Sequence, residues 1–210
     1  MKKFLSIILV FTMFTALSTT ALAAPGSVAE RSLHEPSYQI VAIMVDENTG
    51  IRYTIPSKKI KNVIVANQDG QSFTEETTVT FSVPKNGIAP LISDTAISDT
   101  DVTSTIKIDY TRVEDKIRVN KVSGSWVPAS SLMHIYDREV HYGDGAPSGH
   151  VAHKYPTTNS FSYTTGWSYV IWYPASSDAM TGARAYSRAM VEVSGMGTPH
   201  SLEVFVTASK

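Results

Sequence analysis

The sequence predicts an all-β protein, folded as a single antiparallel β-sandwich of the immunoglobulin-like or jelly-roll-like kind with roughly eight to ten strands. Three observations predict this class. Apolar and polar residues alternate with period two in most segments, and Gly, Pro, Asn or Asp bound each segment. The chain also holds 25 Ser and 22 Thr residues, and β-branched Thr suits the solvated face of a strand.

Composition excludes several classes of protein before any segment is considered. The chain has 210 residues, no cysteine and a formal net charge of -1. Disulfide scaffolds, thiolate zinc sites and cysteine nucleophiles are therefore excluded, and the near-zero charge argues against nucleic acid as a partner. An apolar content of 42% is sufficient for a buried core, and we expect one domain over residues 38–210.

The first 23 residues have the pattern of a secretory signal peptide. Lys2 and Lys3 precede an apolar run over residues 4–17, and Ala21 and Ala23 supply the small residues that a signal peptidase reads. The run is shorter than the roughly 20 residues of a membrane-spanning helix. We therefore predict cleavage between Ala23 and Ala24, a secreted extracellular protein, and no membrane span in the mature chain.

Residues 24–37 show no periodicity and predict a flexible N-terminal segment. The next residues have the pattern of a hairpin. An apolar run over residues 38–45 and an alternating run over residues 51–55 flank a stretch rich in turn residues. Gly50 closes that stretch and can adopt the positive φ that such a loop needs.

Seven further segments alternate in the same way and predict strands: residues 60–66, 77–83, 105–113, 116–122, 132–142, 160–173 and 201–207. Only Glu114 and Asp115 separate two of them, which predicts a tight hairpin. Counting outward from this turn places Tyr110 opposite Val119. One face of the hairpin is then apolar and the other is polar, as expected for one half of a sandwich.

Residues 179–193 fit two periodicities. Five of them share one helical face after a capping Ser177 or Asp178. The same stretch also alternates small and large side chains, with Ala185, Ser187 and Ala189 on one face. Gly182 and the closing Val-Glu-Val-Ser-Gly run favour a strand.

An aromatic-rich segment is the first candidate for a ligand-binding site. Its candidate residues are Tyr163, Trp167, Tyr169 and Tyr173. Rigid aromatic rings on an exposed sheet face can stack on the apolar faces of sugars. The alternative is that one face of this segment belongs to the core.

Acidic residues suggest two further candidate sites. Asp94, Asp99 and Asp101 lie in a connection rich in Ser and Thr, where carboxylates could bind calcium, although the spacing does not match the regular calcium loop. No other cofactor is expected. On a regular strand, Asp137, Glu139 and His141 would project to one side, as metal ligands or as acid and base of a hydrolase, with a solvated polar face as the alternative.

The histidines that follow, His150 and His153, have a weak ligand spacing, and no Gly-x-Ser-x-Gly motif is present. The sequence thus favours a secreted, non-catalytic β-sandwich that binds an extracellular ligand or surface, such as cell-wall glycan. One alternative is a secreted hydrolase that uses the residues around Glu139. The other is a membrane-active oligomerising effector, against which Glu75 and Glu76 argue because adjacent carboxylates on a strand face opposite sides.

Overall fold

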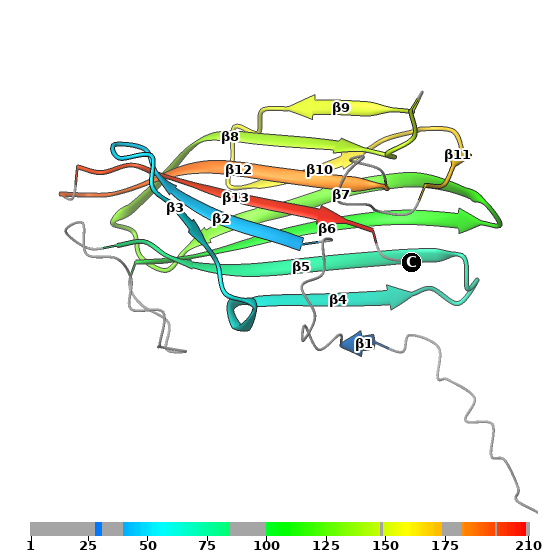
Figure 1. Ribbon diagram of the computed structural model, residues 1–210, viewed down its shortest axis with the longest axis horizontal. Coiled ribbons are helices and arrows are strands. Elements are labelled where there is room, and N and C mark those ends of the chain that lie inside the picture. Colours follow the sequence, from blue (N-terminus) through cyan, green and yellow to red (C-terminus); the bar gives the residue numbers. More distant parts are fainter. Residues whose placement is uncertain are drawn as a thin grey trace, which may run out of the picture.

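Two antiparallel β-sheets pack face to face in the computed structural model of the chain (Figure 1). The model describes residues 28–30, 40–84, 100–147, 149–173, 182–195 and 197–208. The predicted all-β sandwich is therefore confirmed. The predicted signal peptide lies outside the described residues, and within them no helix is long and apolar enough to cross a membrane.

Seven strands form the first sheet, in the order β1-β4-β5-β6-β7-β10, with β11 also paired to β7. Their bounds are β1 Val28–Glu30, β4 Ile60–Ala66, β5 Ser72–Ser82, β6 Asp101–Val113, β7 Lys116–Pro128, β10 Ser160–Thr164 and β11 Val170–Ile171. Strand β1 lies within residues 24–37, for which the sequence predicts a flexible segment.

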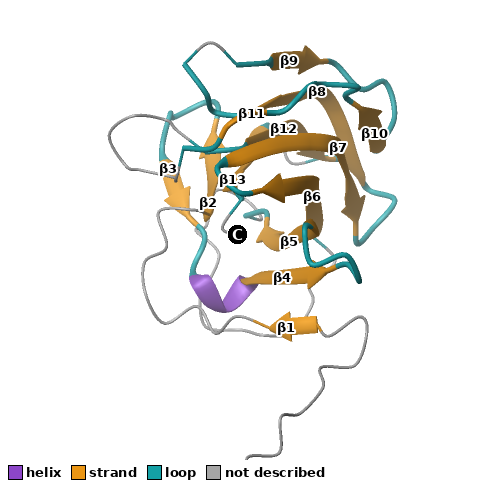
Figure 2. Ribbon diagram, turned by 90° about the vertical axis from the view of Figure 1, so that its right-hand side faces the viewer, coloured by secondary structure: helices purple, strands orange, loops and turns teal. Residues whose placement is uncertain are grey.

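Six strands form the second sheet, in the order β3-β2-β13-β12-β8-β9. Their bounds are β2 Ile40–Asp46, β3 Arg52–Thr54, β8 Met133–Gly143, β9 Val151–Lys154, β12 Arg184–Val193 and β13 His200–Thr207. The 3-10 helix η1 Ser57–Lys59 lies where the chain passes from β3 to β4, and thus from one sheet to the other (Figure 2). The prediction of eight to ten strands is too low, because short strands such as β1, β9 and β11 are not long enough to show a period.

Both predicted hairpins are confirmed. Strand β2 pairs with β3, and Gly50 in their turn has a φ of 71°. Strand β6 pairs with β7 in the predicted register, with Tyr110 opposite Val119. Both of these side chains are fully buried, so the apolar face of this hairpin is the inner face of its sheet.

Strand β12 resolves the ambiguous stretch as a strand. Ala185, Ser187 and Ala189 are fully buried, whereas Arg184 and Arg188 are half-buried on the other face. The small side chains on the inner face allow the two sheets to approach each other over this strand.

Strand β5 confirms that its adjacent carboxylates face opposite sides. Glu75 is buried, and Asn62 Nδ2 donates a hydrogen bond to its Oε1 at 2.9 Å. Glu76 faces outward and forms an ion pair of 2.5 Å with Lys107 on β6.

The single strand predicted over residues 160–173 is wrong, because the chain leaves the sheet between β10 and β11. Thr165 donates its backbone N–H to the Asn120 carbonyl oxygen at 3.0 Å, and its hydroxyl to that of Val119 at 2.5 Å. Gly166 follows with a φ of 66°, which a β-branched residue would avoid. The even alternation of the aromatic residues therefore ends at Thr165.

Candidate ligand and metal site on the outer face of the six-stranded sheet

A β-bulge in strand β8 determines which of its side chains face outward. Glu139 pairs with Arg188 of β12, but Tyr136 pairs with Met190, so Asp137 and Arg138 together oppose Ala189. Asp137 has a φ of 45°. The expectation that Asp137 continues the regular alternation of Glu139 and His141 is therefore wrong, because the bulge shifts the alternation by one residue.

Beyond the bulge, four outward side chains from four adjacent strands form one lateral row. The register pairs His153 of β9 with His141 of β8, His141 with Tyr186 of β12, and Tyr186 with Phe205 of β13. The Tyr186 ring meets the His141 ring edge-on, with 5.6 Å between their centroids. Directly paired residues of neighbouring strands are held close together by the backbone ladder, so the sheet itself positions this row.

At one end of the row, two imidazoles converge on one carboxylate. Glu139 Oε1 lies 2.5 Å from His141 Nε2 and 2.7 Å from His153 Nε2. The two rings are close, with centroids 3.4 Å apart. The hydrogen bond with His141 contributes most to lowering the pKa of Glu139 below its ordinary value. We refer to Glu139, His141 and His153 as the His-Glu cluster.

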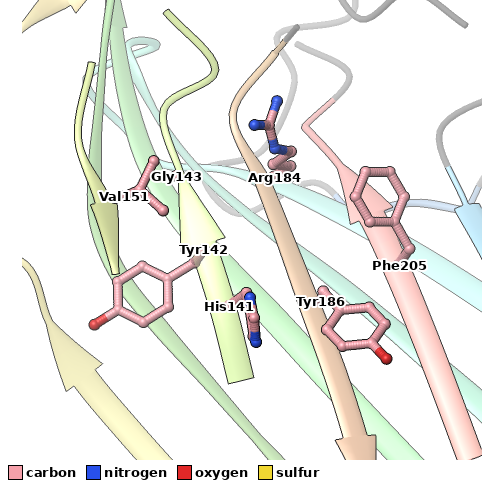
Figure 3. Close-up of a pocket in the computed structure, with 7 residues that line it drawn as sticks. All are labelled: His141, Tyr142, Gly143, Val151, Arg184, Tyr186 and Phe205. Atoms are coloured by element: carbon pink, nitrogen blue, oxygen red, sulfur yellow. The ribbon is translucent and has the colours of Figure 1, made fainter. Parts of the chain in front are cut away.

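A shallow pocket of about 250 Å³ adjoins the His-Glu cluster on the same face. Its lining residues come from β8, β9, β12 and β13 (Figure 3): His141, Tyr142, Gly143, Val151, Arg184, Tyr186 and Phe205. Gly143 faces Arg184 across the ladder and has no side chain to fill the space. Burial raises the pKa of Tyr186 to about 12, so its hydroxyl is neutral at ordinary pH.

Arg184 supplies the positive charge of this pocket. Its Nη1 atom is buried and has no hydrogen-bond partner in the part of the chain that the structure describes. A buried guanidinium N–H without an acceptor costs free energy, and a guanidinium is a strong hydrogen-bond donor to a carboxylate. The pocket therefore combines two half-buried aromatic rings with a donor suited to a carboxylate.

The loop between β8 and β9 is held by the buried carboxylate of Asp144. Its Oδ2 accepts the backbone N–H of His150 at 2.9 Å and lies 2.7 Å from His150 Nδ1. A Cβ at Gly149 would lie only 1.8 Å from Asp144 Oδ1, so only glycine fits there. These contacts give His150 a structural role, distinct from that of the neighbouring His153.

The structure divides the predicted aromatic site. Tyr163 and Trp167 both stack on Tyr142, with centroid distances of 6.2 Å and 5.5 Å. The His150 ring stacks on Trp167, with 5.1 Å between the centroids. Tyr163 and Trp167 also pack against the core. Tyr169 is exposed, and the Arg118 guanidinium lies 4.6 Å from its ring; Tyr173 is half-buried.

Two of the three predicted calcium ligands, Asp94 and Asp99, lie outside the described residues. The third, Asp101, is the first residue of β6 and is 2% exposed. Calcium binding at this connection stays a prediction.

Sequence reasoning did not assign His153, Arg184, Tyr186 or Phe205 to one site. A signal for His153 was present, since counting outward from Pro147 in the β8–β9 loop places it opposite His141. The other three come from strands distant in the sequence, and periodicity alone does not order such strands in a sheet.

Comparison of the chain with protein-family models, with curated proteins and with solved structures finds no match.

Proposed function

We propose that this chain is an exported, non-catalytic β-sandwich that binds an acidic extracellular glycan on the outer face of its six-stranded sheet. One observation carries the proposal. Tyr186 and Phe205 are direct partners on adjacent strands, and Arg184 lines the same pocket. Aromatic rings stack on the apolar faces of sugar rings, and a guanidinium pairs with a carboxylate through two parallel hydrogen bonds.

The arrangement of the pocket supports a binding role over catalysis. Its polar side-chain groups are one guanidinium, one imidazole and two tyrosine hydroxyls whose pKa values are raised by burial, which is a donor set for holding a ligand. Asp137 does not share the alternation of Glu139 and His141. Export is supported by the sequence of residues 1–23, and N-terminal sequencing of the protein from culture medium should find Ala24 first.

Co-sedimentation with insoluble cell-wall material, together with titration of soluble acidic and neutral polysaccharides, tests the proposal. Phe205→Ala should weaken binding to both kinds by about 1–3 kcal/mol, because it removes a stacking surface. Arg184→Gln should weaken only the binding of acidic polysaccharide. Tyr169→Ala is the matched control, since it removes an exposed aromatic ring from a different surface.

The outcomes are distinct. If Tyr169→Ala abolishes binding and Phe205→Ala does not, the ligand binds at the aromatic segment after β10. If the wild-type protein binds none of the polysaccharides, the proposed function is wrong.

A further inference from the structure

We propose that the His-Glu cluster is a binding site for a divalent transition metal of the Zn²⁺ class. Three ligand atoms, one each from Glu139, His141 and His153, lie within 4.8 Å of one another. Two neutral imidazoles and one carboxylate form a frequent catalytic-type zinc ligand set, which leaves a coordination position for water or a ligand. Calcium and magnesium prefer all-oxygen sites, so the imidazoles select a transition metal.

The present distances are compatible with metal entry after small movements. In a tetrahedral site with metal bonds of about 2.0–2.1 Å, ligand atoms are about 3.3 Å apart. Glu139 Oε1 now lies 2.5 Å from His141 Nε2 and 2.7 Å from His153 Nε2. Each pair must therefore separate by less than about 1 Å, which rotation of half-exposed side chains provides without moving the backbone.

The backbone pre-organises the site. Glu139 and His141 are two residues apart on β8, beyond the bulge, and so share the outer face. His153 is the direct partner of His141 in the β8–β9 ladder. The ligands thus come from two paired strands rather than from loops, and little conformational freedom is lost when a metal binds.

Surrounding charges leave the carboxylate available. The nearest cation by register is Arg188, opposite Glu139, but its guanidinium donates to Glu47 Oε1 at 3.3 Å. Side-chain exposures of 40% for both histidines and 23% for Glu139 allow a metal ion and a water ligand to reach the cluster. In the metal-bound state each Nε2 would face the cation, and the single proton of each neutral imidazole would then be on Nδ1.

The cluster also adjoins the pocket, because His141 belongs to both. A bound metal would add positive charge to the same face of the sheet as Arg184. The metal site does not depend on glycan binding, and either can fail without the other.

Titration of chelator-treated, untagged protein with Zn²⁺ by calorimetry tests the inference. Wild-type protein should bind one equivalent, and Co²⁺ at the same site should give the visible absorption of a four- or five-coordinate ion. Glu139→Gln and His153→Asn should each weaken Zn²⁺ binding at least about tenfold, the smallest loss expected even for an outer partner of a ligand. His134→Ala, an exposed histidine on the same strand, should leave binding unchanged.

Thermal unfolding separates a metal site from a cluster that only stabilises the fold. Zn²⁺ should raise the melting temperature of the wild type by mass action and should not raise that of His153→Asn. If a variant fails to fold, histidine NMR signals of the wild type replace it: Zn²⁺ should perturb those of His141 and His153 but not that of His134. Absence of Zn²⁺ binding, binding unchanged in both ligand variants, or perturbation of His134 alone would overturn the proposal.

Discussion

Replacing Gly124 by alanine should destabilise the sandwich at the point where strand β7 meets the aromatic core. Gly124 is the direct partner of Phe161 on β10 and of Ile106 on β6. The Phe161 ring is buried, at 5.2 Å from the Trp126 ring and 5.9 Å from the Tyr163 ring. Because it is enclosed on both sides, this ring cannot move away freely from a new methyl group.

The size of the effect follows from two distances. A Cβ at Gly124 would lie 2.2 Å from the Thr105 carbonyl oxygen and 2.6 Å from Phe161 Cζ, whereas non-bonded carbon contacts are comfortable at about 3.5–4.0 Å. Relief of the contact with the Thr105 carbonyl oxygen requires the backbones of β6 and β7 to move apart. Overpacking of this kind costs about 3 kcal/mol, and the reduced freedom of the unfolded chain offsets about 0.5 kcal/mol. The net loss should be about 2.5 kcal/mol, or about 5–10 °C in melting temperature.

Urea unfolding and thermal melting of Gly124→Ala measure this loss, with Ser123→Ala as the control on the outward face of the same strand. Phe161→Leu in the Gly124→Ala background should not restore stability, because the carbonyl of Thr105 remains in place. A Gly124→Ala protein whose free energy of unfolding is within about 0.5 kcal/mol of the wild-type value would show that the sheet accommodates the methyl group without the expected clash. Full rescue by Phe161→Leu would show that the ring, and not the backbone, sets the cost.

Three further predictions concern the residues around the two sheets. Burial lowers the pKa of His200 below its ordinary value of 6.5, so the unfolded chain binds the proton more tightly. The free energy of unfolding should therefore fall as pH decreases below about 6.5, and urea midpoints at pH 7.5 and 5.5 should differ less in His200→Asn. Asp144→Ala should lower the free energy of unfolding in urea by about 2–3 kcal/mol, because the hydrogen bonds from the backbone and from the side chain of His150 are both lost. His150→Ala keeps the backbone hydrogen bond, so an equal loss in the two variants would show that this bond contributes nothing. Trp167→Ala should lower the free energy of unfolding by about 2 kcal/mol, because Trp167 packs against the core. Tyr169→Ala should lower it by less than about 1 kcal/mol, because Tyr169 is exposed. Equal decreases in melting temperature would contradict this difference in packing.

Regular stretches of the sheets could be predicted because their periodicity is local. Strand β4 has the predicted bounds, residues 60–66, and the β6–β7 hairpin has the predicted register. In β12 the small side chains face inward as the alternation indicated. A side chain on a strand faces the side opposite to its neighbours, so a burial pattern can be read from consecutive residues alone.

The irregular positions could not be predicted in the same way. Tyr110 pairs with Val119 but Asp109 pairs with Lys121, which leaves Asn120 as an extra residue in β7. A bulge of this kind depends on how two strands fit and twist together. Its counterpart at Asp137 shifts the outward face of β8, and no property of Asp137 by itself indicates this shift.

The all-β class, the faces of the long strands and the residue types available for chemistry can be read from the sequence alone, because they follow from composition and from period two. Which side chains meet depends on the order and register of the strands in the folded protein. His141 contacts His153 through the β8–β9 hairpin and Tyr186 through β12, a strand that is more distant in the sequence. Strand order and register result from burying all apolar faces at once. The candidate site is therefore a property of the assembled sheet, and no segment contains it alone.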